Sequence, residues 1–478
     1  MTPRLAWARI APPLLLAATV LLATAGRYGY HRDELYFLVA SRHLAFGYDD
    51  QPPLVPLIIR LETAIGGDSV QVIRVAPMLF ALGLILLAAL CARELAGDDP
   101  IRSRRAQGLA ALATACSLLV LFGGHLFVTS TPDFFFWTLI LWLVLRYLRT
   151  RDDRLWYAIG AAAGVGTLNN NLIAVLALAL LLAAPLTGQT QLLRRRAVWG
   201  GVALALVIAS PDLIWQATHG LPEFRMARHI SSWDERIQLI PFQLETGTAL
   251  SWVWIVGWFR LRADQRYRLF AFAYLLTLAL VLVTGGKRYY PAGWYPLLLA
   301  AGSVWLADQW PRWRTTFVVT AVIGALVALV TGPPVLPISV YRHLTGLNGE
   351  NAETIGWPRF TDTVATVYRA HPGATLLAEN YGEAGALARY GPALGLPTAY
   401  ADHNGYARFG HPTGVSATTV AVGFKPGVLD RYWSSCVVIA RIDNGVGVAN
   451  QEQRRTVQVC TGQREPWEQI WPAMLRYS

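Results

Sequence analysis

The sequence contains few charged residues. Asp, Glu, Lys and Arg make up 15% of its 478 residues, whereas soluble domains contain about 25%. Hydrophobic residues reach 54%, the mean hydropathy is +0.36, and long apolar runs recur along the chain. This composition excludes an ordinary soluble domain and predicts a polytopic α-helical membrane protein.

Several familiar motifs are also missing. The chain has no Gly-rich phosphate loop, no zinc-ligand spacing, no nucleophile elbow, no internal repeat and no low-complexity tract. Sequence support for a nucleotide-binding loop, a zinc module or a serine hydrolase is therefore absent. The first apolar segment lacks a clean small-residue cleavage site, so we expect it to remain as a membrane span.

Cysteine is scarce, with four residues in the chain. Cys91 and Cys116 lie in or beside apolar runs, where a cysteine usually packs as a small hydrophobic side chain. Cys436 and Cys460 lie in the C-terminal region and could pair if that region faces an oxidising compartment. Two cysteines give no disulfide framework, so the sequence leaves this pairing open.

A helix that crosses the hydrocarbon core needs about 20 mostly apolar residues. The apolar runs predict about eleven spans, and the 155–187 region can be interpreted as one long helix or two short ones. The predicted spans are 10–26, 70–92, 107–128, 134–149, 155–169, 171–187, 198–217, 242–259, 267–284, 290–307 and 315–332.

The basic residues indicate the orientation of these spans. The net charge of +11 comes from arginine clusters that all fall on one side when eleven spans are counted, as the positive-inside rule requires. This pattern favours membrane orientation over nucleic-acid binding and places the N-terminus in the cytoplasm. Asp33, Asp133, Lys287 and the C-terminal region then lie on the outer side.

Composition divides the chain into two predicted domains. Residues 1–332 form a transmembrane domain with a long first outer loop, 27–69, and residues 333–478 form a small extracytoplasmic α/β domain. In the loop, the apolar spacing predicts helices that lie along the interface at 33–45 and 53–65. Short β-rich runs in the C-terminal domain predict strands at 374–378, 418–422, 436–442 and 456–460.

Two acidic sites on the predicted outer side carry the chemistry. Asp33 and Glu34 follow the first span closely, and a carboxylate there can take a proton from an attacking hydroxyl or bind a metal. Asp133 stands at the outer start of the fourth span. The structural alternative for Asp33 and for Asp133 is a helix N-cap.

Basic, amide and imidazole side chains form a second group of candidates. Lys287 and Arg288 lie on the outer side against the positive-inside trend and suit a lipid phosphate; the alternative is snorkelling toward headgroups. His219 follows an aromatic Trp215 that could simply anchor at the interface. Asn170 could be polar glue between helices, and His403, beside an Asn-Gly turn, could be structural.

The motifs of the first loop resemble those of a known group of enzymes. Residues 28–37 and 47–54 resemble the GT-C superfamily of polyprenyl-phosphate-dependent glycosyltransferases, in particular the bacterial protein mannosyltransferase and lipid A aminoarabinose transferase families. Weaker matches continue in order to the C-terminal domain. They are Thr131-Pro132-Asp133, Trp215-Gln216 with His219-Gly220, Lys287 with Tyr289-Tyr290, Gly356-Trp357-Pro358 and His403-Asn404.

The resemblance implies an inverting hexosyl or pentosyl transferase at the outer face of the bacterial plasma membrane. It would move a sugar from a polyprenyl phosphate to a hydroxyl of a cell-wall glycan, glycolipid or protein. Asp33 would be the base, Glu34 its neighbour and Asp133 a second acid, with a divalent Mg²⁺ or Mn²⁺ at Asp33 and Asp133 left open. The implied donor-phosphate residues are Lys287, Arg288 and Tyr290, and the implied acceptor or sugar residues are His31, Gln51, His219, Asn170 and His403.

Two positions depart from the family pattern. Gln51 stands where many relatives have Lys or His before the Pro-Pro pair, and Asn169-Asn170 stands where many have Asn-Lys. The change at Gln51 removes a contact to phosphate or acceptor, and the change at Asn170 removes a cation that would contact the donor. Two other classes of function remain: a lipid or sugar-lipid transporter, which should show inverted repeats, and a non-catalytic protein that binds lipid-linked sugar. Turnover of a labelled donor separates these from an enzyme.

Overall fold

The computed structural model describes residues 4–229 and 231–477. It divides by contacts into two units, each considered separately. The helical unit comprises Met1–Ala25, Gln51–Leu54 and Arg74–Pro333, and the α/β unit comprises Gly26–Asp50, Val55–Ile73 and Pro334–Ser478. Most of the 27–69 segment therefore groups with residues of the C-terminal region, whereas the predicted domain boundary at 332 assigns it to the transmembrane domain.

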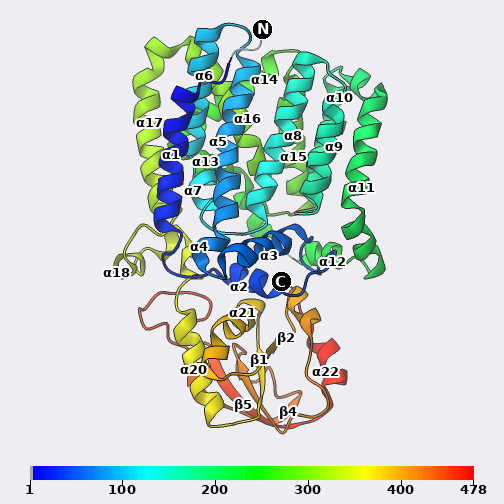
Figure 1. Cartoon of the computed structure of the whole chain (residues 1–478), viewed down its shortest axis with the longest axis vertical. Coiled ribbons are helices and arrows are strands. Elements are labelled where there is room, and N and C mark those ends of the chain that lie inside the picture. Colours follow the sequence, from blue (N-terminus) through cyan, green and yellow to red (C-terminus); the bar gives the residue numbers. More distant parts are fainter. Residues whose placement is uncertain (1–3, 230, 478) are drawn as a thin grey trace. The chain divides into compact units, whose positions relative to one another are not determined.

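Long apolar helices build the helical unit (Figure 1). All eleven predicted spans correspond to a helix or a broken helix, and the 155–187 region forms two helices. The elements are α1 (Trp7–Thr24), α5 (Val75–Leu95), α6 (Pro100–Ala115), α7 (Leu118–Gly123), α8 (Ser130–Thr150), α9 (Leu155–Thr167), α10 (Ile173–Leu186), η1 (Thr190–Arg194), α11 (Arg196–Thr218), α12 (Pro222–His229), α13 (Trp233–Gly247), η2 (Thr248–Leu250), α14 (Ser251–Ala263), α15 (Arg268–Thr284), η3 (Tyr290–Trp294), α16 (Tyr295–Asp308) and α17 (Trp310–Thr331).

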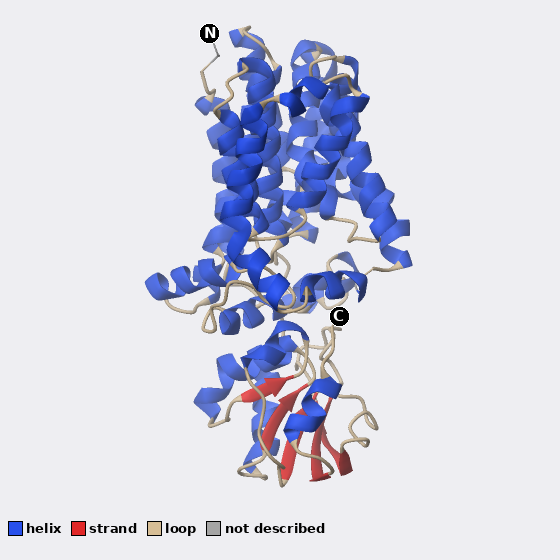
Figure 2. Cartoon of the chain, turned by 90° about the vertical axis from the view of Figure 1, so that its right-hand side faces the viewer, coloured by secondary structure: helices blue, strands red, loops and turns tan. Residues whose placement is uncertain are grey.

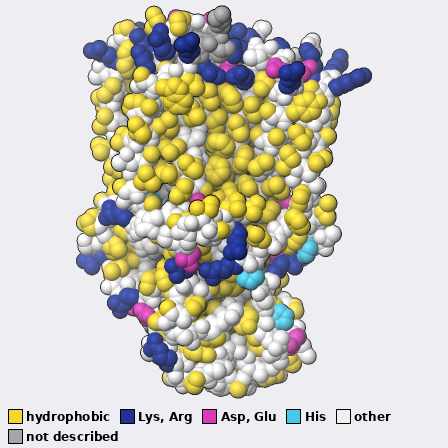
Figure 3. All heavy atoms as spheres, viewed as in Figure 1, with side chains coloured by type: hydrophobic (Ala, Val, Ile, Leu, Met, Phe, Trp, Pro, Cys, Tyr) yellow, Lys and Arg dark blue, Asp and Glu magenta, His cyan; other side chains and the backbone are white. Residues whose placement is uncertain are grey.

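Five stretches of helix among the described residues are long and apolar enough to cross a membrane: Trp7–Thr24, Val70–Leu95, Ser130–Thr150, Arg196–Thr218 and Trp310–Thr331. Three shorter helices, α9, α10 and α15, are apolar as well. The outward faces of the apolar helices carry exposed aliphatic side chains. On α11, for example, Leu206 and Val207 are 56% and 68% exposed. Figure 3 shows this apolar belt and the Lys and Arg side chains gathered at the end of the unit that carries the N-terminus. The fold is that of a multi-pass membrane protein.

Close helix packing in this unit depends on small residues. Gly257 of α14 faces the carbonyl oxygen of Leu298 of α16, and a Cβ on Gly257 would lie 1.9 Å from that oxygen. Gly302 of α16 faces the carbonyl of Val253 in the same way, with 2.0 Å between the built Cβ and the oxygen. These glycines let the two backbones approach, as small residues do between membrane helices.

The α/β unit contains the first-loop helices and a five-stranded sheet (Figure 2). Its order is β2-β1-β3-β5-β4, with β1 parallel to β2 and β3, and β5 antiparallel to β3 and β4. The elements are α2 (Arg32–Ala40), α3 (Leu54–Gly66), α4 (Val70–Ile73), α18 (Ile338–Tyr341), η4 (Thr345–Leu347), α19 (Gly349–Ala352), α20 (Trp357–Arg369), β1 (Thr375–Ala378), α21 (Tyr381–Tyr390), η5 (Gly391–Leu394), β2 (Ala399–Ala401), η6 (Asn404–Phe409), β3 (Thr418–Val422), β4 (Trp433–Arg441), β5 (Thr456–Gln463) and α22 (Trp467–Met474).

The four predicted strands are confirmed, and the structure adds the short strand β2. The core beside the sheet is aromatic, with Trp433 and Trp467 fully buried near Leu377 and Ala421. Since β1, β2 and β3 run parallel, their carboxyl ends share one edge of the sheet. The residues that follow β1 and β2, Glu379–Tyr381 and Asp402–Asn404, therefore lie at that edge.

Helix α2 packs on α21. The helix is shorter than predicted: it ends at Ala40, whereas the sequence predicts an end near residue 45. Leu35 lies against Gly385 of α21, where a Cβ on the glycine would be 2.8 Å from the Leu35 carbonyl carbon. The missing side chain at Gly385 lets α2 lie directly on α21 and fixes the start of α2 near Tyr381.

The cysteine pairing that the sequence left open is present. Cys436 of β4 and Cys460 of β5 are direct cross-strand partners and form a disulfide, while Cys91 and Cys116 are buried as free thiols. We expect non-reducing peptide mass mapping to recover a peptide pair linked through Cys436 and Cys460. Alkylation under native conditions should leave Cys91 and Cys116 unmodified. Recovery of Cys436 as an alkylated free thiol would contradict the pairing.

Candidate active site

The start of α2 separates the roles of Asp33 and Glu34. His31 is the N-cap residue: its Nδ1 accepts the Asp33 amide N–H at 3.2 Å. The Glu34 carboxylate accepts the His31 amide N–H at 2.7 Å, which completes a capping box. The structural alternative in which Asp33 caps the helix is therefore wrong. Glu34 is fully buried in the cap, whereas Asp33 lies in the first turn with its carboxylate directed elsewhere.

The Asp33 carboxylate remains partly open to solvent. Its side chain is 29% exposed, and Oδ1 accepts a hydrogen bond from the Tyr381 hydroxyl at 2.8 Å. Oδ2 lies 3.8 Å from His31 Nδ1, beyond hydrogen-bond range. Negative charge in this first turn is favoured by the helix dipole. The arrangement gives a partly accessible carboxylate with one oxygen held and the other available.

His31 is largely committed to structure. Because Nδ1 accepts a backbone N–H, the neutral ring carries its proton on Nε2, which lies 3.1 Å from Glu350 Oε2. Burial lowers the pKa of His31, but the nearby carboxylates of Asp33, Glu350 and Glu34 outweigh it, and the net direction is upward. The predicted contact of His31 with acceptor or sugar stays a prediction.

In the 47–54 motif, the adjacent acids Asp49 and Asp50 also have different partners. Asp49 is buried, where it accepts from Arg408 and, at 3.1 Å, from the Tyr477 hydroxyl. Asp50 accepts from the Tyr36 hydroxyl at 2.8 Å and from the Gly405 amide at 3.4 Å. Burial, aided by the charge of Asp49, raises the pKa of Asp50 to about 7 despite these hydrogen bonds. Asp49 anchors Arg408 and Tyr477, and Asp50 is held by Tyr36 and the Gly405 amide.

His403 packs against Tyr381. The two rings are stacked, with centroids 5.0 Å apart and planes 15° apart. Burial and the nearby cations of Arg476 and Arg32 lower the pKa of His403 to about 3. The imidazole is therefore neutral at physiological pH and acts here as a flat, buried ring. The predicted acceptor contact of His403 stays a prediction.

In the helical unit, Asp133 lies in the first turn of α8, whose N-cap residue is Thr129. The side chain is 1% exposed, and within the described part of the chain its Oδ1 has no hydrogen-bond partner. Burying a carboxylate in this way is costly in a purely structural role. The N-cap interpretation of Asp133 is wrong, since the residue lies beyond the cap.

The predicted metal involves Asp33 and Asp133. Over residues 4–229 and 231–477, no group of three or more His, Cys, Asp or Glu side chains is arranged to hold a metal ion. Mg²⁺ prefers one or two carboxylates together with substrate phosphates, so one acid from either motif does not make a dedicated site.

The turn before η3 that carries Lys287 and Arg288 is held by Glu235. Lys287 Nζ lies 3.5 Å from Glu235 Oε1, and the Arg288 amide donates to Glu235 Oε2 at 2.9 Å. The Arg288 guanidinium lies over the Phe242 ring, 5.5 Å from its centroid. Glu235 is on α13 and was not among the predicted site residues. It positions the cations and also competes with any phosphate that binds them.

Tyr290 connects this basic turn with Asp133. Its hydroxyl lies within electrostatic range of both Asp133 and Glu235. The adjacent Tyr289 ring meets Phe134 edge to face, with 6.4 Å between the centroids. The start of α8 and the 285–290 turn are therefore neighbours. The structure brings together Asp133, Tyr290 and the Lys287–Glu235 pair from separate parts of the sequence.

The remaining predicted residues of the helical unit are Gln51, Asn170 and His219. Gln51 is 3% exposed, and neither of its amide atoms bonds to another described residue. Asn170 accepts from the Leu172 amide at 3.1 Å in the break between α9 and α10. His219 ends α11, exposed and stacked on Trp215 with 4.1 Å between the centroids. Asn170 and His219 thus make local structural contacts.

A polar cluster near the end of α11 was not predicted. Glu223 accepts hydrogen bonds from Gln216, at 2.7 Å, and from Asn171. Asp212, one turn before Gln216, is fully buried, and its two carboxylate oxygens bond to no other described residue. A Pro-Asp pair inside an apolar run is the signal in the sequence that could have pointed to it.

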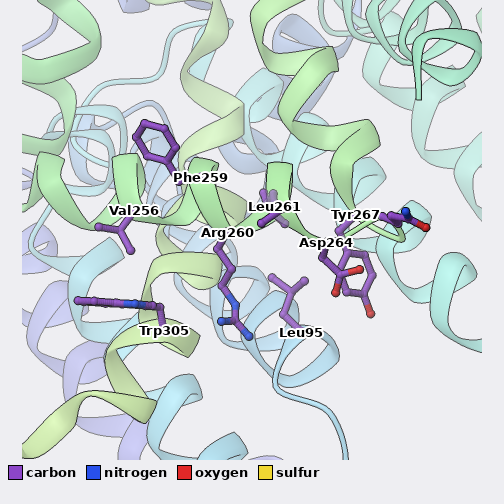
Figure 4. A pocket seen from close by; sticks show the side chains of 10 residues that line it. Leu95, Val256, Phe259, Arg260, Leu261, Asp264, Tyr267 and Trp305 are labelled. Atoms are coloured by element: carbon purple, nitrogen blue, oxygen red, sulfur yellow. The ribbon is translucent and has the colours of Figure 1, made fainter. Parts of the chain in front are cut away.

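A cavity of about 720 Å³ opens where α14 meets the following loop. Arg260, Asp264, Tyr267 and Trp305 line it with apolar neighbours (Figure 4). None of the predicted site residues is in its lining. Arg260 is also 4.0 Å from Asp308, whose nearer partner is Arg102 at 2.7 Å. The cavity is therefore separate from the predicted acidic and basic site residues.

The comparisons with known proteins agree with this fold. A model of the dolichyl-phosphate-mannose-protein mannosyltransferase family matches residues 50–215. ArnT from Cupriavidus metallidurans, in the apo state, superposes with a TM-score of 0.64 at 15% identity, covering 94% of this chain and 97% of that chain. The same protein bound to undecaprenyl phosphate gives 0.62 at 16% identity, covering 95% and 98%.

A weaker match is the Archaeoglobus fulgidus oligosaccharyltransferase tethered to an acceptor peptide, with a TM-score of 0.41, 12% identity, and coverage of 80% and 63%. No curated protein sequence matches this one. The resemblance to the GT-C glycosyltransferases is confirmed by the mannosyltransferase family match and by the fold shared with ArnT.

The raised pKa of Asp50 predicts a pH-dependent cost in stability. The folded protein ionises Asp50 near pH 7, and an unfolded chain ionises it near about 4. The unfolded state therefore binds fewer protons between these values, and stability falls as the pH rises through them. Asp50→Asn should raise the thermal unfolding midpoint more at pH 8.5 than at pH 5. The exposed Asp362→Asn is the control; an equal gain at both pH values would contradict the assignment.

Proposed function

We propose that the protein is an inverting glycosyltransferase that moves a hexosyl or pentosyl unit from a polyprenyl phosphate to an acceptor hydroxyl at the outer face of a bacterial plasma membrane. The acceptor classes are a cell-wall glycan, a glycolipid or a protein. The observation that carries the proposal is the partly exposed Asp33 carboxylate at the start of α2. It lies in a chain whose fold matches a protein solved with undecaprenyl phosphate.

Asp33 is proposed as the general base. The acceptor hydroxyl oxygen forms a bond to the anomeric carbon of the sugar, and the bond from that carbon to the phosphate oxygen breaks. Asp33 receives the hydroxyl proton, and the polyprenyl phosphate leaves with the bonding electrons. Oδ2 is the oxygen that takes the proton, because Oδ1 is already hydrogen-bonded to Tyr381.

Lys287 and Arg288 are proposed to bind the donor phosphate. Lys287 is a point charge whose present partner, Glu235, is 3.5 Å away. Charge–phosphate contacts stabilise the leaving group as its negative charge develops. Asp133 and Tyr290, which neighbour the basic turn, are proposed as the polar groups beside this phosphate. Gln51, Asn170 and His219 remain candidates for sugar or acceptor contact.

The first test separates Asp33 from Glu34. Asp33→Asn should lower transfer from a radiolabelled polyprenyl-phosphate sugar at least about 100-fold, because a general base contributes about 10²–10⁴-fold. Glu34→Gln should stay within a few-fold of the wild type, since an amide oxygen can still accept the His31 N–H. The exposed Asp362→Asn is the control. Full turnover by Asp33→Asn, in a protein that folds normally, would remove the proposal.

The second test uses the Lys287–Glu235 pair, whose members should act in opposite directions. Lys287→Gln should raise the KM for the donor about 10- to 100-fold, since a hydrogen bond to a charged group contributes about 1.5–3 kcal/mol. Glu235→Gln should lower that KM, because it releases Lys287 from its competing partner. Lys425→Gln, in the α/β unit, is the control. An unchanged donor KM in both variants would exclude Lys287 from phosphate binding.

A further inference from the structure

Tyr381 occupies a rigid position in the α/β unit. It is the first residue of α21, directly after the carboxyl end of β1 and a two-residue link. Asn380 caps the helix: its side chain accepts the Glu383 amide at 2.9 Å, and the Glu383 carboxylate accepts the Asn380 amide at 3.2 Å. This capping box fixes the backbone of Tyr381 at the end of the sheet.

The ring of Tyr381 is held by three neighbours. His403 stacks on it with 5.0 Å between the centroids. The Arg32 guanidinium carbon lies 5.0 Å from the ring centroid, a favourable cation–π distance. Tyr36 contacts it at a tilt of 44°, with centroids 5.1 Å apart. Arg32 and Tyr36 belong to α2, and His403 lies between β2 and η6, so contacts from two separate segments restrict rotation of the ring.

The hydroxyl of this restrained ring donates to Asp33 Oδ1 at 2.8 Å. Burial and the charge of Asp33 raise the pKa of Tyr381 well above its usual value. The phenol thus keeps its proton near neutral pH and remains a hydrogen-bond donor there. A donor to one carboxylate oxygen favours the ionised form and restricts the side chain to one rotamer.

We propose that Tyr381 is a positioning residue for the reaction: it holds Asp33 through Oδ1 and directs Oδ2 toward the acceptor hydroxyl. This inference rests on the proposed function, and it assigns part of the catalytic apparatus to the C-terminal sheet. His403 and Arg32 act through Tyr381 by holding its ring. His403 is a packing surface in this assignment and transfers no proton.

Several other charged groups surround the Asp33–Tyr381 pair and enter any interpretation of its pH dependence. They are His31, Arg32 and Glu34 on the α2 segment, Asp50 after it, and Glu350, Glu353 and Glu452 from the C-terminal region. Glu34 is held by the capping box and Asp50 by Tyr36. A change at the Tyr381 hydroxyl alone leaves these contacts in place.

The experiment compares Tyr381→Phe with Tyr406→Phe in the full-length protein. Tyr406 is a buried tyrosine of the same ring cluster, 6.4 Å from Tyr36 by centroids, and it is not bonded to Asp33. Tyr381→Phe should lower kcat about tenfold with little change in KM. It should also move the acidic limb of the kcat/KM profile to higher pH, because the ionised carboxylate loses its donor. Tyr406→Phe should do neither.

A second pair of variants tests the ring contact. His403→Phe keeps a flat ring on Tyr381 and should retain most of kcat, whereas His403→Ala should reproduce the loss seen in Tyr381→Phe. A large loss in His403→Phe with normal activity in His403→Ala would overturn the packing role.

The two proposals fail in distinguishable ways. If Asp33→Asn is inactive while Tyr381→Phe has the wild-type rate and pH profile, Tyr381 does not position Asp33 and the glycosyltransferase proposal stands. If Asp33→Asn remains active, the proposed function itself fails. A Tyr381→Phe variant that loses activity through unfolding would show a lowered thermal midpoint. In that case the pH profile of the folded fraction, normalised to its own maximum, decides: an unshifted acidic limb overturns the positioning role.

Discussion

The packing of α2 on α21 is the constraint on which the candidate active site depends. Gly385 has no side chain, and this lets the Leu35 backbone approach α21. The approach brings the start of α2 to the carboxyl edge of the sheet, where Tyr381 reaches Asp33. Ligands of parallel α/β sheets commonly bind at this edge. Here the edge receives a segment of the same chain, and that segment carries the acid.

Several charged residues that stand out in the sequence have structural partners. Asp49 is bound to Arg408 and Tyr477, and Lys287 to Glu235. Such contacts hold the loops and turns on which function depends. They also show why a motif cannot be converted directly into a list of catalytic residues. In the Asp33–Glu34 pair, Glu34 is fixed in the capping box, whereas the Asp33 carboxylate is partly exposed.

Features that depend on local composition were predictable. Apolar runs gave the helices of the multi-pass fold, and β-rich runs gave β1, β3, β4 and β5, because burial leaves a direct mark on sequence. The three-residue strand β2 leaves too short a pattern to find. Tyr381 and Glu235 were missed for another reason: each meets its partner across a long separation in sequence, 348 residues in the case of Tyr381 and Asp33. No periodicity or motif records such a contact.

The geometry of a helix start explains which member of the Asp33–Glu34 pair is available for chemistry. Successive side chains on a helix point about 100° apart, so two adjacent acids in the first turn cannot share one environment. At the third helical position a glutamate can reach back to the N-cap amide, and Glu34 does so at 2.7 Å. Asp33, one position earlier and one methylene shorter, is directed toward α21 and solvent. The same turn therefore uses one acid to define the helix and leaves the other as the candidate base.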